Sequence, residues 1–145
     1  MTITPRAPYD TGDMLTALCV WRESRGCTYE AMRGVVWVLK NRCAMAPAQG
    51  FAHTMQENIL KPWAFSSFNS KDPNSGKYPN DGDESWVHCM EAVSSTEPDN
   101  TDGAVFYFSR PMIEAPKVWG DVIVTAQFGG LTFCGFSERV PEVVT

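Results

Sequence analysis

The sequence predicts an α+β domain in which helices come first and a small antiparallel sheet follows. Its 145 residues fit a single domain, 1–145, and leave little room for two. Hydrophobic residues make up 43% of the chain, which is enough to bury a core at this size. Helical periodicity and capping residues occupy the first two-thirds, whereas short runs of β-branched and aromatic residues occupy the last third. This order is typical of the α+β class.

The first helix is predicted over residues 14–21, after N-cap chemistry at residues 10–13. The run is apolar nearly all round, with only Thr16 interrupting it. A helix of this kind usually lies buried in the middle of a domain. We expect it to end between Arg22 and Gly26, because glycine suits the left-handed position that follows a helix.

Three further helices are expected, each introduced by a residue that favours the N-cap position. In the second helix, apolar residues recur at i, i+3, i+4, i+7 and i+11. In the third, Thr54 and Glu57 have the spacing of a capping box. The expected segments run from Thr28 to about Asn41–Cys43, from Thr54 to Leu60, and from about Asp83 to Ser95.

Three strands are expected in the last third of the chain, at Ala104–Phe108, Asp121–Phe128 and Leu131–Phe136. Gly129 and Gly130 separate the last two strands, and a pair of glycines is typical of a tight two-residue hairpin turn. Residues 140–145 are expected to form a tail.

Charge and hydropathy argue against two classes of partner. Seventeen acidic against twelve basic residues give a net charge of −5, which opposes binding to nucleic-acid phosphates. No run approaches about 18 consecutive apolar residues, so we expect no membrane insertion. Residues 1–13 show no basic segment followed by an apolar stretch, so we expect no secretory signal peptide.

Cysteine and histidine content predicts neither a disulfide scaffold nor a metal centre. The five cysteines are an odd number at irregular spacing, so we expect reduced, mostly buried thiols. The only histidines are His53 and His88, and no C-x-x-C or H-x-x-x-H pair occurs. We therefore expect no metal and no cofactor.

One segment stands out by its length and composition. From Ser66 to Gly82 the chain is almost entirely Ser, Asn, Lys, Asp, Pro and Gly, and an aromatic segment at 63–65 leads into it. Loops of this length in compact domains are usually binding loops or disordered. Aromatic rings followed by amides and hydroxyls suit a sugar, whereas the alternative is a solvated surface loop.

Glu23 is the residue that the sequence singles out for catalysis. It shares a helical face with Thr16 and Cys19, so its carboxylate leaves the end of a buried helix. Partial burial and the negative end of the helix dipole both raise the pKa of a carboxyl, as a general acid near neutral pH requires. The alternative is a surface glutamate paired with Arg22 or Arg25, which would oppose that rise in pKa.

Two other groups of residues have simpler interpretations. Cys27 and His88 could form the thiolate–imidazole pair of a cysteine amidase. No local sequence signature of such an enzyme supports this pair, and a packed cysteine with a surface histidine is the simpler interpretation. The acidic residues Asp81, Asp83 and Glu84 lack the spacing of a calcium-binding loop, and helix N-capping explains them.

Four short blocks over about residues 14–134 match the motifs of one family, in the family's order. E-[AS]-x-G followed by N-R is similar to Glu23–Gly26 and Asn41-Arg42. An aromatic-plus-Ser step of the Q-F-S kind is similar to Trp63–Ser66, and D-x-x-x-G-A-x-x-Y to Asp99–Tyr107. P-x-x-W and T-A-x-x-G are similar to Pro116–Trp119 and Thr125–Gly129. Together the blocks resemble the germination-type cell-wall hydrolases, the SleB-like family.

The resemblance implies a lysozyme-like α+β catalytic domain that cleaves the glycan strands of peptidoglycan. The family's catalytic glutamate falls on Glu23, as the general acid on the glycosidic oxygen. In lytic transglycosylases of the family, the 6-hydroxyl of muramic acid attacks the anomeric carbon and leaves a 1,6-anhydro end. Because that reaction needs only one protein carboxylate, we expect a lytic transglycosylase in which Glu23 acts first as acid and then as base.

Within and beside the matched blocks, polar or aromatic residues are candidates for a saccharide groove: Phe65, Ser66, Asn69, Tyr107 and Gln127. The runner-up reaction is that of a muramidase, in which water attacks the same bond. Asp72 in the long loop is then the candidate for the second carboxylate that a hydrolase normally uses.

The chain departs from the family pattern at Phe108 and Leu131, where the family often has histidine. This departure favours a non-catalytic glycan-binding module or virion part, whereas Glu23 opposes it. Germination proteins of the family also carry a signal peptide and often a wall-binding domain, and neither is seen here. A leaderless catalytic domain fits a bacteriophage endolysin that accumulates in the host cytoplasm and reaches the wall through a separate holin. A virion-associated lysin would look much the same.

Overall fold

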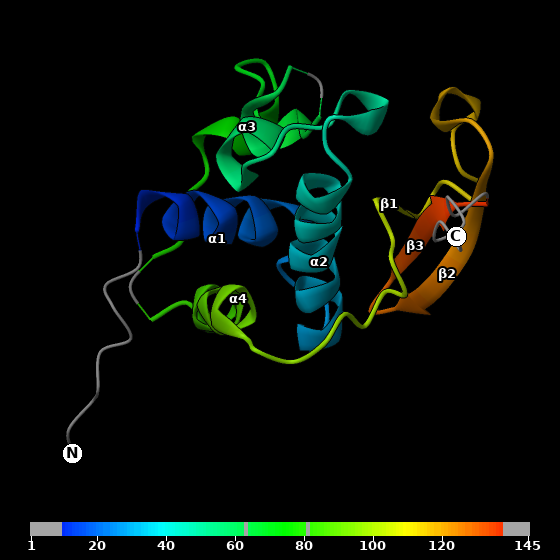
Figure 1. The fold of residues 1–145 in the computed structure, drawn as a ribbon. Coiled ribbons are helices and arrows are strands. Elements are labelled where there is room, and N and C mark those ends of the chain that lie inside the picture. Colours follow the sequence, from blue (N-terminus) through cyan, green and yellow to red (C-terminus); the bar gives the residue numbers. More distant parts are fainter. Residues whose placement is uncertain (1–9, 63, 81, 138–145) are drawn as a thin grey trace.

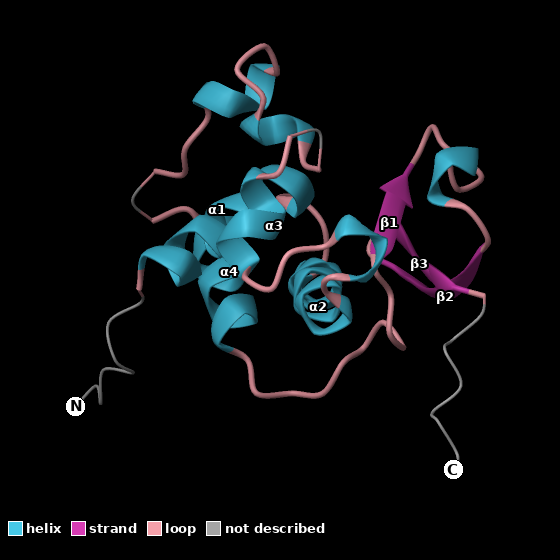
Figure 2. Ribbon diagram, turned by 45° about the horizontal axis from the view of Figure 1, so that its top comes forward, coloured by secondary structure: helices cyan, strands magenta, loops and turns pink. Residues whose placement is uncertain are grey.

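The computed structural model describes residues 10–62, 64–80 and 82–137. Trp63, Asp81 and the expected tail at 140–145 therefore lie outside the described residues. In the described part, four α-helices precede a three-stranded antiparallel sheet (Figure 1, Figure 2). The predicted α+β class is confirmed.

The second, third and fourth α-helices begin after the N-cap residue that the sequence predicts, whereas the first begins at Thr11, within the predicted cap segment 10–13 and before its predicted start at residue 14. Asp10, Thr28, Thr54 and Asp83 each accept a hydrogen bond from a backbone N–H in the following turn. The helices are α1 (Thr11–Ser24), α2 (Tyr29–Met45), α3 (Met55–Leu60) and α4 (Glu84–Ser94). Helix α2 continues past its predicted end at 41–43 and stops just before Pro47, because proline disfavours helical backbone in the residue before it.

Helix α2 lies between α1 and α4 on one side and the sheet on the other (Figure 1). The sequence predicts this central place for α1, which is indeed mostly buried. The helix that is buried on several faces and also meets the sheet is α2. Its Gly34 lets the Phe133 ring approach the backbone, since a Cβ at Gly34 would overlap that ring.

The sheet has the order β1-β3-β2 and consists of β1 (Phe106–Ser109), β2 (Val122–Phe128) and β3 (Leu131–Phe136). Gly129 and Gly130 both have positive φ, as the predicted two-residue hairpin requires. Strand β1 begins two residues later than predicted, although the Val105 N–H still donates to the Cys134 carbonyl. Tyr107 of β1 packs against Phe133 of β3, which belongs to the core that the sheet shares with α2.

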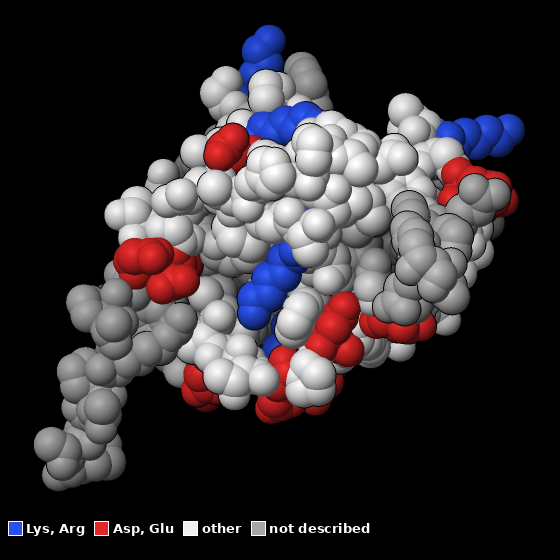
Figure 3. Space-filling view, viewed as in Figure 1, with Lys and Arg blue, Asp and Glu red and all other residues white. Residues whose placement is uncertain are grey.

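The five cysteines are free, and three of them, Cys19, Cys89 and Cys134, are buried. No helix in the described ranges is long and apolar enough to cross a membrane. On the face drawn in Figure 3, Lys and Arg atoms lie in separate places and form no continuous basic surface.

Candidate active site

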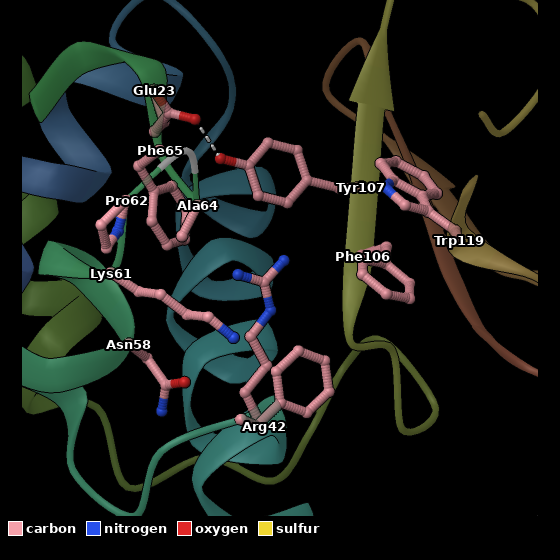
Figure 4. A pocket seen from close by; sticks show the side chains of 11 residues that line it. Glu23, Arg42, Asn58, Lys61, Pro62, Ala64, Phe65, Phe106, Tyr107 and Trp119 are labelled. Carbon is pink, nitrogen blue, oxygen red and sulfur yellow. Dashed lines mark hydrogen bonds between the residues drawn. The ribbon is translucent and has the colours of Figure 1, made fainter. Parts of the chain in front are cut away.

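A cavity of about 350 Å³ brings the end of α1 together with α2, β1 and the segment that follows α3 (Figure 4). The described residues that line it are Glu23, Arg42, Phe51, Asn58, Lys61, Pro62, Ala64, Phe65, Phe106, Tyr107 and Trp119. Three of the predicted site residues, Glu23, Phe65 and Tyr107, therefore meet in one place. The other predicted groove residues, Ser66, Asn69 and Gln127, are not among the lining residues.

Glu23 and Tyr107 form the polar contact at one end of this cavity. The Tyr107 hydroxyl donates a hydrogen bond to Oε1 of Glu23 (Figure 4). Burial, with the Glu23 charge beside it, raises the pKa of the phenol well above its usual value, so Tyr107 stays protonated and remains a donor. The contact orients the carboxyl of Glu23 toward the cavity.

The pKa of Glu23 is raised above its ordinary value, and burial is the main cause. The nearby negative charge of Asp72 raises it further. The Tyr107 hydrogen bond, the neighbouring Ser67 hydroxyl and the positive charge of Arg42 lower it, but burial outweighs them. Glu23 therefore has the raised pKa that a general acid near neutral pH requires.

The arginines on either side of Glu23 point away from it and bind the long loop. Arg22 is buried and donates to three loop carbonyls, those of Ser67, Ser75 and Lys77, at 3.2, 3.0 and 3.1 Å. Arg25 donates to Oδ1 of Asn74 at 2.7 Å. The alternative of a surface glutamate paired with Arg22 or Arg25 is therefore wrong.

The long loop is ordered around Arg22 and contains two short 3₁₀ helices, Ser66–Phe68 and Pro73–Gly76. Its first turn exposes Ser66 and buries Ser67 beside Glu23, so the serine that faces the carboxyl is one residue later than the predicted one. The Asp72 carboxylate caps the second turn by accepting from the Asn74 N–H at 2.8 Å. Asp72 therefore acts on Glu23 through its charge from outside the cavity lining.

Arg42 of α2 forms the floor of the cavity. Its Nε donates to the Val105 carbonyl at 2.7 Å, and its guanidinium lies 5.2–5.5 Å from the ring centres of Phe51, Phe65 and Phe106. Burial lowers the pKa of Arg42, while Tyr107 and Glu23 raise it. An arginine remains charged under these conditions, so the floor carries a positive charge.

Asn41, the residue before Arg42, connects α2 to the segment that leads into β1. Its Nδ2 donates to Oδ2 of Asp99 and to the Ala104 carbonyl, both at 2.9 Å. Asp99 also accepts from the backbone N–H groups of Thr101 and Gly103, at 2.7 and 3.0 Å. The two blocks matched from the sequence, N-R and D-x-x-x-G-A-x-x-Y, thus form one network that sets the position of Tyr107.

Aromatic rings form the wall beside Tyr107. Phe106 and Trp119 are stacked with ring centres 4.6 Å apart and planes 6° apart. Both line the cavity (Figure 4), and such rings can pack against the apolar face of a sugar.

Gln127 lies in a second cavity at the other end of the hairpin, of about 430 Å³. Phe108 and Leu131, the two positions that depart from the family pattern, line this second cavity as well. Neither of them lines the cavity of Glu23. Phe108 nevertheless lies near that cavity, because its ring centre is 6.4 Å from that of Trp119.

Cys27 does not have the properties of a nucleophile. Burial raises the pKa of its thiol, whereas a catalytic cysteine needs a lowered pKa. His88 is exposed and lies edge-on to Tyr29 at 6.3 Å between ring centres. These contacts support the simpler interpretation of a packed cysteine and a surface histidine.

Eight of the lining residues were not predicted from the sequence: Arg42, Phe51, Asn58, Lys61, Pro62, Ala64, Phe106 and Trp119. For four of them a signal existed, because Arg42, Ala64, Phe106 and Trp119 lie within the matched blocks. Lys61 follows α3 and is one of several lysines, and nothing in the local sequence distinguishes it.

Comparison with known proteins gives a consistent result. The family model described as "Cell Wall Hydrolase" matches residues 26–134, beginning three residues after Glu23. The catalytic domain of the Bacillus cereus SleB protein is 25% identical, with a TM-score of 0.63 over 89% of this chain and 94% of that chain. The catalytic domain of the germination-specific lytic transglycosylase SleB from Bacillus anthracis has the same identity and TM-score, over 89% and 98%. A search of curated proteins finds no match. The structural likeness confirms the predicted lysozyme-like fold.

Proposed function

The chain belongs to the cell wall hydrolase family, and we propose that this peptidoglycan-degrading enzyme is a lytic transglycosylase acting between N-acetylmuramic acid and N-acetylglucosamine. The observation that carries the proposal is the Glu23 carboxyl. It lies in the last turn of α1, accepts from Tyr107, opens onto the cavity and has a raised pKa. The likeness to a catalytic domain described as a lytic transglycosylase supports the reaction type.

In the first step Glu23 acts as a general acid. Its protonated carboxyl donates a proton to the glycosidic oxygen while the bond from that oxygen to the anomeric carbon breaks. Tyr107 keeps the carboxyl oriented and donates to the carboxylate that remains. Burial supplies the raised pKa that keeps a protonated fraction available.

In the second step Glu23 acts as a base. The 6-hydroxyl oxygen of muramic acid attacks the anomeric carbon, and the Glu23 carboxylate takes the proton of that hydroxyl. A 1,6-anhydro ring closes and the acid is regenerated. This sequence needs one protein carboxyl, and Glu23 is the one carboxyl among the described residues that line the cavity.

A muramidase is the second candidate, because Asp72 is close enough to raise the pKa of Glu23. In that reaction water attacks in place of the 6-hydroxyl, and Asp72 would provide the second carboxylate. The capping hydrogen bond from the Asn74 N–H keeps Asp72 outside the cavity lining, which favours the transglycosylase.

Digestion of purified sacculi followed by mass spectrometry tests the two reactions. We expect 1,6-anhydro muropeptides from the wild type, none from Glu23→Gln, and an unchanged product from Asp72→Asn. Reducing-end products that disappear in Asp72→Asn would instead establish the muramidase. Binding of sacculi by the wild type without any product would contradict both reactions.

The biological setting stays a prediction: bacteriophage lysis, with storage in the host cytoplasm and wall access through a holin. Expression in a bacterial cytoplasm with and without a pore-forming holin tests it. Lysis is expected only when both proteins are present.

A further inference from the structure

The cavity of Glu23 has a cationic end that the proposed reaction does not use. Besides Glu23, the charged residues among its described lining are Arg42 and Lys61, and both are positive. In Figure 4 the Lys61 and Arg42 side chains both point into the cavity below Glu23 and Tyr107. The chain as a whole carries a charge of −5, so this local positive charge runs against the overall balance.

Arg42 gives this end of the cavity a buried cation whose position is fixed by the protein. The side chain is only 8% exposed, and among the described residues it donates through Nε alone, to the Val105 carbonyl. Within the described residues no acceptor is bound to its two terminal nitrogens, and neither nitrogen is sealed off from the cavity. A buried guanidinium with free donors is suited to a carboxylate.

Lys61 stands at the mouth of the same end. Its ammonium donates to the Gly50 carbonyl and has no carboxylate partner among the described residues. Gly50 directly precedes Phe51, whose ring lies 5.4 Å from the Arg42 guanidinium, so the two cations flank one short segment. An ammonium with three donors and one protein acceptor retains capacity for a ligand.

We propose that Lys61 and Arg42 bind a carboxylate of the muramic acid side chain, and that this contact selects peptidoglycan over glycans without carboxylates. The inference rests on the proposed function, because it assigns a specificity subsite within the same cavity. Two sources supply this chemistry: the carboxylates of the peptide stem, and the lactyl carboxylate that is freed when the stem is removed. N-acetylglucosamine oligomers carry neither.

Binding to the Glu23→Gln variant, measured by titration calorimetry, separates these ligands without turnover. The probes are stem-bearing glycan strands, amidase-stripped strands that carry only lactyl carboxylates, and N-acetylglucosamine hexamer. Adding Lys61→Ala is expected to weaken binding of a carboxylate-bearing strand about five- to tenfold. Binding of the hexamer should not change. A loss with stripped strands identifies the lactyl carboxylate, whereas a loss confined to stem-bearing strands identifies a stem carboxylate.

Two further variants keep the test independent of folding. Lys61→Arg preserves the charge and should retain binding, and Lys77→Ala removes an exposed charge that does not line the cavity. An equal loss on all three probes, or no loss on any, would overturn the proposal. Release of 1,6-anhydro products by the wild type is measured separately, so a failure of the proposed function is distinguished from a failure of this subsite.

Discussion

The cavity of Glu23 and the cavity of Leu131 adjoin the same strand but differ in chemistry. Tyr107 and Phe108 are neighbours on β1, yet Tyr107 lines the first cavity and Phe108 lines the second. The first cavity holds a carboxyl of raised pKa and two cations. The second has no carboxyl among its described lining residues, and its charged residue among those described is Arg110.

The two positions at which the sequence departs from the motifs of the family it resembles belong to the second cavity. Phe108 and Leu131 stand where those motifs often have histidine, and both line that cavity. In the first cavity Tyr107 donates to Glu23, and the positive charge of Arg42 lowers the pKa of Glu23. The substitutions therefore remove polar groups from a region that does not touch the carboxyl, which weakens the argument for a non-catalytic module.

The largest effect is expected from Glu23→Gln. Loss of the general acid should lower the rate of glycan cleavage by about 10²- to 10⁴-fold. The same substitution should raise the free energy of unfolding at neutral pH. Because burial raises the folded-state pKa of Glu23, the wild type loses stability as the pH rises from the unfolded-state pKa through the folded-state pKa.

Urea unfolding at several pH values measures this difference in stability between Glu23→Gln and the wild type. The variant should be more stable than the wild type above the folded-state pKa of Glu23 and equal to it below the unfolded-state pKa. A variant that is less stable at neutral pH would mean that Glu23 contributes to the fold rather than to the reaction.

Tyr107→Phe should lower kcat by about tenfold to a hundredfold, because the carboxyl loses its orienting donor. The pH profile gives the sharper measurement. Activity falls as the pH rises and Glu23 loses its proton. The Tyr107 hydroxyl lowers the pKa of Glu23, so its removal should shift this limb of the profile to higher pH. If this limb did not shift, Tyr107 would have no influence on the ionisation of Glu23 during the reaction.

Asp99→Ala tests the hydrogen-bond network that positions the strand of Tyr107. The variant leaves Asn41 and the Thr101 N–H without their acceptor, and we expect a loss of about 1–3 kcal/mol in the free energy of unfolding. Burial raises the pKa of Asp99, but hydrogen bonds from Thr101, Asn41 and Gly103 outweigh it and hold the pKa below its usual value. The loss should therefore be complete above the unfolded-state pKa and shrink as the pH falls through the folded-state pKa.

Asp121→Ala is the matched control for Asp99→Ala. Asp121 is exposed, and its hydrogen bonds to Ser137 use its backbone carbonyl rather than its carboxylate. Chemical denaturation should find its stability within about 0.5 kcal/mol of the wild type. An equal loss in both variants would show that the Asp99 network does not support the strand specifically.

The features that the sequence predicts well are those determined by neighbouring residues. The N-caps at Asp10, Thr28, Thr54 and Asp83 depend on one side chain and the turn that follows it. The hairpin at residues 129–130 depends on positive φ at two glycines. Glu23 belongs to this group in part, because its place at the end of a buried helix follows from the pattern of that helix alone.

The features that escape prediction depend on contacts between distant residues. Arg22 binds the loop carbonyl of Ser67, 45 positions away, so its orientation away from Glu23 is not encoded locally. The choice between Ser66 and Ser67 depends on one 3₁₀ turn, since a shift of one residue reverses which side chain faces inward. Lys61 reaches the cavity only because α3 ends beside Gly50, and no motif records that.

The smallest effect is expected from Gln127→Ala, and it decides whether the two cavities are independent. Gln127 is exposed and donates to Oγ1 of Thr132 at 3.3 Å. It lines the second cavity but not the cavity of Glu23. Its removal should change the free energy of unfolding by about 0.5 kcal/mol or less. Digestion kinetics on sacculi should give kcat and KM close to the wild-type values. If KM rose while kcat stayed constant, the glycan would extend past Tyr107 to the second cavity. In that case Phe108 and Leu131 would contact substrate, and their divergence from the family would bear on which wall the enzyme cuts.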